Sequence, residues 1–233
     1  MDSASVSITG PKKSNQDSLL SPTTLNGITL AGVADGVGGH ADGKFASETA
    51  IEAIAKFIEG DPNAPLADAF VFAREAIVQA AERFPLSATM ATTLSVVRII
   101  GQQAEVGHVG DSRVYHLRNE GLQSRTIDQT EIAELVRQNV FTPEEALRYP
   151  RRNVLLSSLA AKSMFDFYQT AFETAHGDAI IICTDGFYNA VKKTEFISQF
   201  RETNTAQGLL EAVVKAGSER GFKDDASIIV LRL

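Results

Sequence analysis

Two apolar runs that each end in an Asp-Gly pair decide how this chain folds. They are ITLAGVA at residues 28–34, which continues into Asp35-Gly36, and AIIICT at residues 179–184, which continues into Asp185-Gly186. Short apolar runs flanked by glycine predict buried strands. An aspartate at the end of such a strand is held rigidly and points out of the core. The chain therefore presents two carboxylates in similar, well-fixed positions.

Two further aspartates stand beside apolar runs. Asp111 follows VGHVG at residues 106–110, and Asp224 comes shortly before SIIVL at residues 227–231. If the four strand ends converge, they form an oxygen-rich site of the kind that binds hard divalent cations. Carboxylates about 4 Å apart repel each other by roughly 4 kcal/mol per pair at an effective dielectric constant of 20. Such a cluster is unfavourable unless cations bind to it.

The composition excludes several classes of protein. A chain of 233 residues that is 44% hydrophobic is long enough for one well-filled core, so we expect a single domain spanning residues 1–233. The net charge of −7 and the lack of a Lys/Arg block argue against a nucleic-acid partner. The start has no basic region followed by an apolar one, and no run reaches membrane length, so we expect a cytoplasmic protein without a membrane partner. The single cysteine, Cys183, lies in an apolar run and is expected to be a small core residue.

The order of elements argues against a simple alternation of strand and helix. A strand at residues 27–34 is followed by helical spacing of apolar residues at 42–59 and again at 66–84, with no strand between them. Residues 3–9 alternate weakly and predict an edge strand. After Pro85 the chain is β-like, and we expect a meander of antiparallel strands at 92–100, 104–109 and 113–117. The remaining predicted elements are a short helix beginning at Pro143 with Thr142 as its cap, a strand at 179–184, helices near 194–201 and 205–219, and a strand at 227–232.

The glycine-rich segment DGVGGHADGKF at residues 35–45 invites nucleotide-binding interpretations, and each fails on a specific residue. A dinucleotide fingerprint needs a second strand after the helix, and a second helix is predicted there instead. A phosphate-binding loop needs Ser or Thr where Phe45 stands. A calcium loop needs an oxygen ligand where Val37 stands. A phosphatase with a nucleophilic aspartate would have a second Asp two positions on, but Val37 and Phe187 occupy those places. Metal ligation remains the better use of both Asp-Gly pairs.

Several short blocks, in order along nearly the whole chain, carry a family resemblance. No single block is decisive, but their order and spacing resemble the metal-dependent Ser/Thr phosphatases of the protein phosphatase 2C (PPM) family in its compact bacterial form. The blocks are KKSNQD (12–17), ADGVGGH (34–40), MATTL (90–94), HVGDSR (108–113), RNVL (152–155), CTDG (183–186) and DDAS (224–227).

The resemblance implies an α+β fold, a four-layer α-β-β-α sandwich of two antiparallel sheets flanked by helix pairs. It also implies a mobile flap at about residues 128–158, beside the cleft, which usually influences substrate choice. By analogy, two Mn²⁺ or Mg²⁺ ions are bridged by Asp35, and the Gly36 carbonyl binds one of them. Asp185 and Asp224 are the expected ligands of the other ion.

Further roles follow from the same resemblance. Asp111, together with Asp185, is expected to hold a third, weaker ion. Asp17 is expected to hydrogen-bond metal-bound waters, as carboxylates around metal sites generally do. Lys12 stands where the family usually has an Arg that binds the substrate phosphate, and Lys keeps the charge without the two-pronged grip. Lys13 is an alternative phosphate binder, and Asp225 is expected to be a loop acid beside the true ligand.

The activity that the resemblance implies is hydrolysis of phosphoserine and phosphothreonine in proteins by a metal-activated water, without a covalent enzyme intermediate. The catalytic residues would be Asp35, Asp185, Asp224 and Asp17. The partners would be phosphorylated proteins, the substrates of a cognate Ser/Thr kinase in bacterial signalling, and we expect a monomer. Two alternatives stay open. One is a catalytically weak or inactive regulatory relative that binds a partner through the flap, which only Lys12 favours, and the other is a small-molecule phosphatase.

Overall fold

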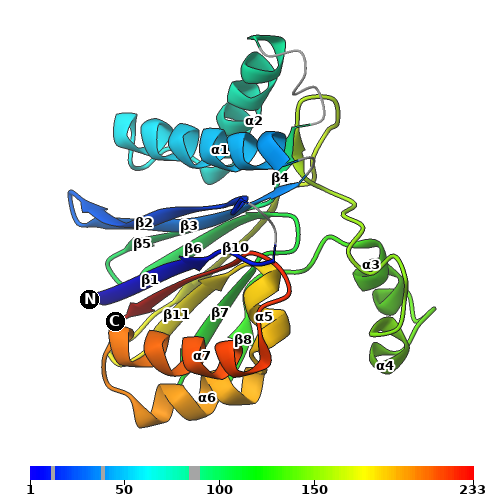
Figure 1. Ribbon diagram of the computed structural model, residues 1–233. Helices are drawn as coiled ribbons and strands as arrows, with labels where there is room; N and C mark the ends of the chain where they lie inside the picture. The colour runs from blue at the N-terminus through cyan, green and yellow to red at the C-terminus, as the bar shows by residue number, and fades with distance from the viewer. Residues whose placement is uncertain (12–13, 38–39, 84–89) are drawn as a thin grey trace.

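Two antiparallel β-sheets lie face to face, and helices cover the outer face of each sheet, which gives four layers (Figure 1). The computed structural model describes residues 1–11, 14–37, 40–83 and 90–233. The smaller sheet has the strand order β1 (Asp2–Ile8), β12 (Ala226–Arg232), β11 (Ala179–Cys183), β7 (Arg113–Arg118) and β8 (Gly121–Ser124). The larger sheet has the order β10 (Tyr168–Glu173), β6 (Gln103–Val109), β5 (Leu94–Ile100), β3 (Ile28–Val37), β4 (Ala91–Thr92) and β9 (Leu159–Ala160), with β2 (Asp17–Leu25) paired to β3.

The core between the two sheets explains why the central strands are apolar at nearly every position. Val33 of the larger sheet and Ile182 and Ile229 of the smaller sheet are fully buried in this middle layer. Their neighbours in sequence face the other way, so that Ile181 and Cys183 pack under the helices of the smaller sheet. A strand covered on both faces needs apolar residues on both. Cys183 is a buried core residue, as predicted.

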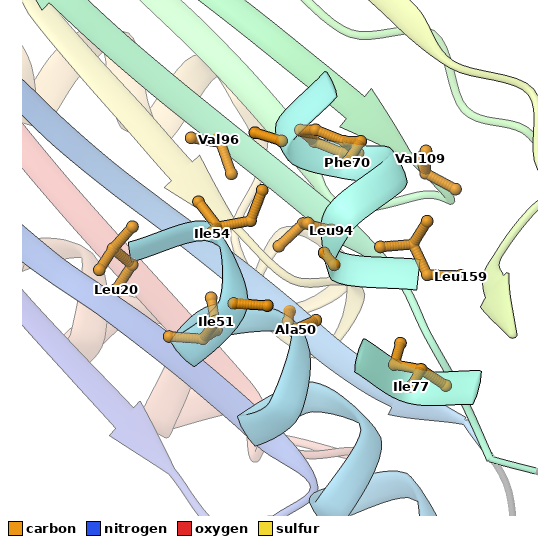
Figure 2. Close-up of a cluster of buried hydrophobic side chains, with 14 of the residues drawn as sticks. Leu20, Ala50, Ile51, Ile54, Phe70, Ile77, Leu94, Val96, Val109 and Leu159 are labelled. Atoms are coloured by element: carbon orange, nitrogen blue, oxygen red, sulfur yellow. The ribbon is translucent and has the colours of Figure 1, made fainter. Parts of the chain in front are cut away.

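Helices α1 (His40–Gly60) and α2 (Leu66–Arg83) cover the larger sheet. Figure 2 shows the cluster that joins them to it, in which Ile54 and Phe70 lie against Leu94 and its neighbours on the strands. Ile54, Phe70 and Leu94 have no exposed surface. This continuous apolar contact fixes α1, and therefore its first turn, against the end of β3.

Three helices cover the smaller sheet: α5 (Asp185–Ala190), α6 (Lys193–Glu202) and α7 (Ala206–Arg220). Phe196 of α6 packs in one cluster with strand residues such as Ile228. The two helices predicted near 194–201 and 205–219 are confirmed as α6 and α7. The short helix α5 follows β11 directly and was not predicted.

A segment with two short helices projects from the side of the layers, as Figure 1 shows for α3 (Glu131–Arg137) and α4 (Pro143–Ala146). A β-bridge between Thr130 and Leu155 joins its two ends. It falls within residues 128–158, which we predicted to be a flap. The predicted cap of α4 is confirmed, because the Thr142 hydroxyl accepts a hydrogen bond from the backbone N–H of Glu145 at 3.2 Å.

The predicted meander of strands at 92–117 is wrong at one point. Strands β5 and β6 form a hairpin in the larger sheet and β7 and β8 form one in the smaller sheet, so the chain crosses between sheets at Gly110-Asp111. Gly110 has a φ of 108°, and a Cβ there would lie 2.6 Å from the side chain of Thr93. Alternation of apolar residues reports which faces are buried, not which strand is the neighbour. The crossing was therefore not visible in the pattern.

Strands β2, β8 and β10 were also not predicted. Strand β2 contains Pro22, which argues against a regular strand, and its pairing with β3 shifts register between Leu20 and Thr23. The predicted edge strand at residues 3–9 is confirmed as β1, which lies at the edge of the smaller sheet. Among the helices of the described residues, none combines the length and the apolar character that a membrane crossing requires.

We expect Ile182→Ala to lower the free energy of unfolding by about 2 to 5 kcal/mol, because it leaves a cavity in the layer between the sheets. Ile100→Ala is the matched control, since Ile100 also lies in a strand but is 42% exposed. The control should cost about 1 kcal/mol or less. Urea denaturation of both variants measures the difference, and equal losses would contradict the buried position of Ile182.

Candidate metal centre

Four of the predicted aspartates line one pocket of about 180 Å³. Asp35, Asp111, Asp185 and Asp224 lie around it, together with Gly36. They come from β3, from the crossing between the sheets, from the first residue of α5 and from the connection that leads into β12. We expected Asp35 to stand at the end of its strand, but this prediction is wrong, because β3 continues to Val37. The pocket therefore lies where the ends of both sheets and two connections meet.

Asp17 stands directly opposite Asp35 in the pairing of β2 with β3. Like charges in this position destabilise a pair of strands. Asp17 is only 2% exposed, and its Oδ2 accepts a hydrogen bond from the Thr184 hydroxyl at 2.8 Å. Its Oδ1 is buried and has no hydrogen-bond partner in the structure. A buried, unpartnered carboxylate oxygen costs free energy, which a bound water or cation would relieve.

The pKa values of three of these carboxyl groups, those of Asp17, Asp35 and Asp111, are displaced upward. Burial raises the pKa of Asp35 well above its usual range, and the charges of Asp17, Asp185, Asp111 and Asp224 raise it further. Burial is also the main cause that raises the pKa of Asp17 and that of Asp111 to about 7. Protons therefore compete with cations for this pocket at neutral pH, and cation binding would release them.

Two threonines fix the backbone of Asp35. The Asp35 N–H donates to the Thr93 hydroxyl at 3.0 Å, and the Asp35 carbonyl accepts from the Thr92 hydroxyl and from the Thr93 N–H, both at 2.9 Å. The Thr93 hydroxyl also lies 3.0 Å from that of Ser112, next to Asp111. These bonds couple the position of β3 to the connection that carries Asp111.

The glycines of the two Asp-Gly pairs permit close approach of a neighbouring segment. A Cβ on Gly36 would lie 2.0 Å from the carbonyl oxygen of Gly43 in the first turns of α1. A Cβ on Gly186 would lie 2.1 Å from the carbonyl oxygen of Asp225. Any side chain at either place would push that segment away. Gly186 thus allows the connection that contains Asp224 to pack against the start of α5, where Asp185 lies.

Asp225 has a role that the sequence did not indicate, since we expected only a loop acid. It is 2% exposed, and its two oxygens accept hydrogen bonds from the backbone N–H groups of Gly10 and Gln16, each at 2.9 Å. Asp225 therefore holds both ends of the segment that contains Lys12 and Lys13. Those two lysines lie outside the described residues, so the predicted phosphate binder is not placed. The partners of Asp225 are more than 200 positions away in sequence, and no local pattern could have revealed them.

The donor set fits a hard divalent cation, because it consists of carboxylate oxygens and the Gly36 carbonyl, with the buried Asp17 Oδ1 still unpartnered. Within residues 1–11, 14–37, 40–83 and 90–233, no three His, Cys, Asp or Glu side chains are placed so that they could hold one ion together. The carboxylates thus surround the pocket rather than converge on one point. That arrangement suits ions such as Mg²⁺, which retain several waters.

Known proteins are similar to this chain over most of its length. A family model described as protein phosphatase 2C matches residues 9–215. The chain is 30% identical over 226 residues to the serine/threonine protein phosphatase PstP of Mycobacterium tuberculosis, an alignment that covers 94% of this chain but only 42% of that protein. It is 28% identical to the serine/threonine phosphatase stp of Listeria monocytogenes, covering 85% of this chain and 82% of that one. The solved catalytic domain of PstP in complex with two manganese ions is similar with a TM-score of 0.84 and 27% identity, covering 98% of this chain and 96% of that one.

We expect the metal-free protein to lose stability as the pH rises from about 4 to about 7. In this range the carboxyls of Asp17 and Asp111 remain protonated in the folded state, where their pKa is about 7, but ionise in the unfolded state near 3.8. The folded state then binds more protons than the unfolded state. Its stability is therefore greatest at a pH below the pKa of the unfolded state, and it falls as the pH rises towards and through the pKa of the folded state. Thermal unfolding in EDTA at several pH values measures this effect.

Asp111→Asn should flatten this pH dependence, whereas Glu52→Gln, an exposed control on α1, should leave it unchanged. Saturating Mn²⁺ should oppose the loss at neutral pH, because cation binding favours the ionised carboxylates. A metal-free protein that gains stability over the same range would contradict the raised pKa values.

We expect Asp225→Ala to lower the free energy of unfolding by about 2 to 4 kcal/mol, because two backbone N–H groups lose a charged acceptor. Asp225→Asn should cost less, since one amide oxygen can still accept one of the two bonds. Urea denaturation in EDTA compares the two variants. If both variants are as stable as the unmodified protein, the stabilising role that we assign to Asp225 is wrong.

Proposed function

The chain belongs to the protein phosphatase 2C family, and on that premise we propose that it hydrolyses phosphoserine and phosphothreonine in proteins with the help of two Mn²⁺ or Mg²⁺ ions. The single observation that carries the proposal is the pocket that half-buried Asp35 lines together with the carboxylates of Asp111, Asp185 and Asp224. Four acidic groups are held together at a cost in free energy, which bound divalent ions would offset.

The proposed ligands are those that the family resemblance implies, and all of them line the pocket. Asp35 and the Gly36 carbonyl would help to hold the pair of ions, together with Asp185 and Asp224. Asp111 and Asp185 also line a second cleft of about 400 Å³ beside the flap, which supports a third, weaker site there. Support for Asp185 as a ligand comes from its place at the start of α5, where backbone N–H groups favour a carboxylate.

When bound, the ions supply an activated water and neutralise charge on the phosphoryl oxygens. The residues of the chain do the positioning. Asp17 accepts from the Thr184 hydroxyl through one oxygen, and its other oxygen, which is buried without a partner, would accept from a metal-bound water. The clamp of Asp225 fixes Gly10 and Gln16, which stand on either side of Lys12 and Lys13 in the sequence, and one of these two lysines is the proposed binder of the substrate phosphate. No side chain is required as a nucleophile, so no covalent enzyme intermediate forms.

The substrate class is taken from the relatives, two of which are described as serine/threonine phosphatases. We propose phosphoproteins made by a cognate Ser/Thr kinase as substrates, within a cytoplasmic signalling system. We also propose that residues 1–233 act as one catalytic domain and as a monomer.

A second candidate is a regulatory relative that binds a partner through the flap without turnover. Lys12, in place of the Arg usual in the family, is the one feature that favours it. Calorimetric titration with Mn²⁺ separates the two candidates, because a catalytic site should bind divalent ions tightly. Absence of such binding would favour the regulatory role.

We expect turnover of p-nitrophenyl phosphate and of a phosphothreonine peptide when Mn²⁺ is present, and loss of at least about 100-fold in kcat for Asp35→Asn, Asp185→Asn or Asp224→Asn. Each substitution keeps the size of the side chain and removes the charge that holds an ion. Glu52→Gln, which removes a charge on the exposed face of α1, is the matched control and should retain full activity. The proposal fails if the unmodified protein shows no turnover above that of Asp185→Asn.

A further inference from the structure

A further cleft, of about 460 Å³ and distinct from the one of about 400 Å³ beside the flap, adjoins the proposed catalytic pocket. Asn153, Asp185 and Asp224 line both cavities, so the two are adjacent. The walls of this cleft come from the flap, from α5 and from the connection between α7 and β12. A peptide whose phosphorylated residue occupies the catalytic pocket has room for its neighbouring residues there.

Three basic side chains line the cleft, and two of them are available for a ligand. Arg220 is already engaged, because it donates to the carbonyl of Ala190 at 2.9 Å and pairs with Glu195 at 2.6 Å. Arg152 is exposed, and among the described residues its side chain donates to one group, the carbonyl of Leu147, at 3.1 Å. Lys223 is exposed and makes no hydrogen bond or ion pair with any described residue. We call the space between Arg152 and Lys223 the cationic cleft.

The two available cations lie next to residues of the catalytic pocket. Lys223 directly precedes Asp224, and Arg152 directly precedes Asn153, so each pair of Cα atoms is about 3.8 Å apart. An extended peptide advances about 3.3 to 3.6 Å per residue. The long side chains of Arg and Lys therefore reach groups that lie one to three residues from the phosphorylated one.

The overall charge of the chain makes these two cations more significant. A net charge of −7 repels acidic peptides at long range, so attraction for them must come from local groups. Among the described residues that line the cleft, Arg152 and Lys223 are the basic side chains that can supply such attraction.

We propose that the cationic cleft selects phosphoprotein segments that carry a second anionic side chain within three residues of the phosphorylated Ser or Thr. This inference rests on the proposed phosphatase function and specifies its substrates. The anionic group is a carboxylate or a second phosphate, since both offer charged oxygens to Lys and to the planar guanidinium of Arg.

The test compares phosphothreonine peptides in an alanine background that differ at one neighbouring position. The position holds Glu, phosphoserine or neutral Gln, placed on the N-terminal side in one set and on the C-terminal side in another. The measured quantity is the ratio of kcat/KM for the anionic peptide to that for the Gln peptide. Because both peptides use the same metal centre, a general loss of activity cancels in the ratio.

We expect the unmodified protein to favour the anionic peptides of at least one set by about three- to tenfold, as one or two exposed charge-assisted contacts allow. The ratio should fall to near one in the Arg152→Gln/Lys223→Gln variant. The matched control is the double variant Arg148→Gln/Lys215→Gln, which also removes two positive charges. Arg148 lies in the flap and Lys215 on α7, and neither lines the cleft, so this variant should leave the ratio unchanged. A larger effect of phosphoserine than of Glu identifies multiply phosphorylated segments as the preferred ligands, and the reverse identifies acidic ones.

The inference is overturned if the ratio is near one in the unmodified protein, or if the double variant keeps it. Binding to the Asp185→Asn variant gives a measurement that does not need turnover. The same peptides, labelled with a fluorophore, are titrated with this variant, and fluorescence anisotropy reports their binding. If the unmodified protein shows no turnover but the anionic peptides still bind more tightly, the proposed phosphatase function is wrong and the proposed selectivity of the cleft is retained. If p-nitrophenyl phosphate is hydrolysed but no peptide is preferred, the phosphatase function is retained and the proposed selectivity of the cleft is wrong.

Discussion

Mutual repulsion of buried carboxylates is the constraint on which the rest of this structure depends. Asp17 and Asp35 face each other across two strands, and Asp111, Asp185 and Asp224 add their charges from three other segments. Burial makes the charges of Asp17, Asp35 and Asp111 harder to sustain, which is the main reason that the pKa values of these three groups rise. A chain that holds such a group together must compensate through packing elsewhere.

That compensation comes from the layers behind the pocket. The apolar middle layer and the two helix-covered faces hold β3, β11 and β12 in place through contacts that do not depend on the acidic groups. Hydrogen bonds then fix the details, since Thr92 and Thr93 hold the backbone of Asp35 and Asp225 holds the segment 10–16. Stability resides in the core and function at its edge, a separation common in enzymes that keep a strained site on a rigid scaffold.

The same edge explains how specificity could be added without disturbing the metal centre. The flap projects from the layers and borders the pocket through Asn153 and Leu155 (Figure 1). Its exposed Arg152 and the exposed Lys223 flank the cationic cleft from two different parts of the chain. Such surface residues can vary at little cost in stability, because few core contacts depend on them.

The sequence by itself determined the identity of the strands beside the acidic residues, the helix pairs and the four aspartates that line the pocket, because burial, helical spacing and Asp-Gly pairs are local properties. It did not reveal that β6 and β7 belong to different sheets, nor that β2, β10 and α5 exist, because an apolar alternation does not name the neighbouring strand. Only the tertiary structure decided that Asp17 faces Asp35, that Asp225 clamps a segment more than 200 residues away, and that Arg152 and Lys223 share a cleft. Each of these depends on contacts between distant segments, whose geometry is set by the packing of whole layers.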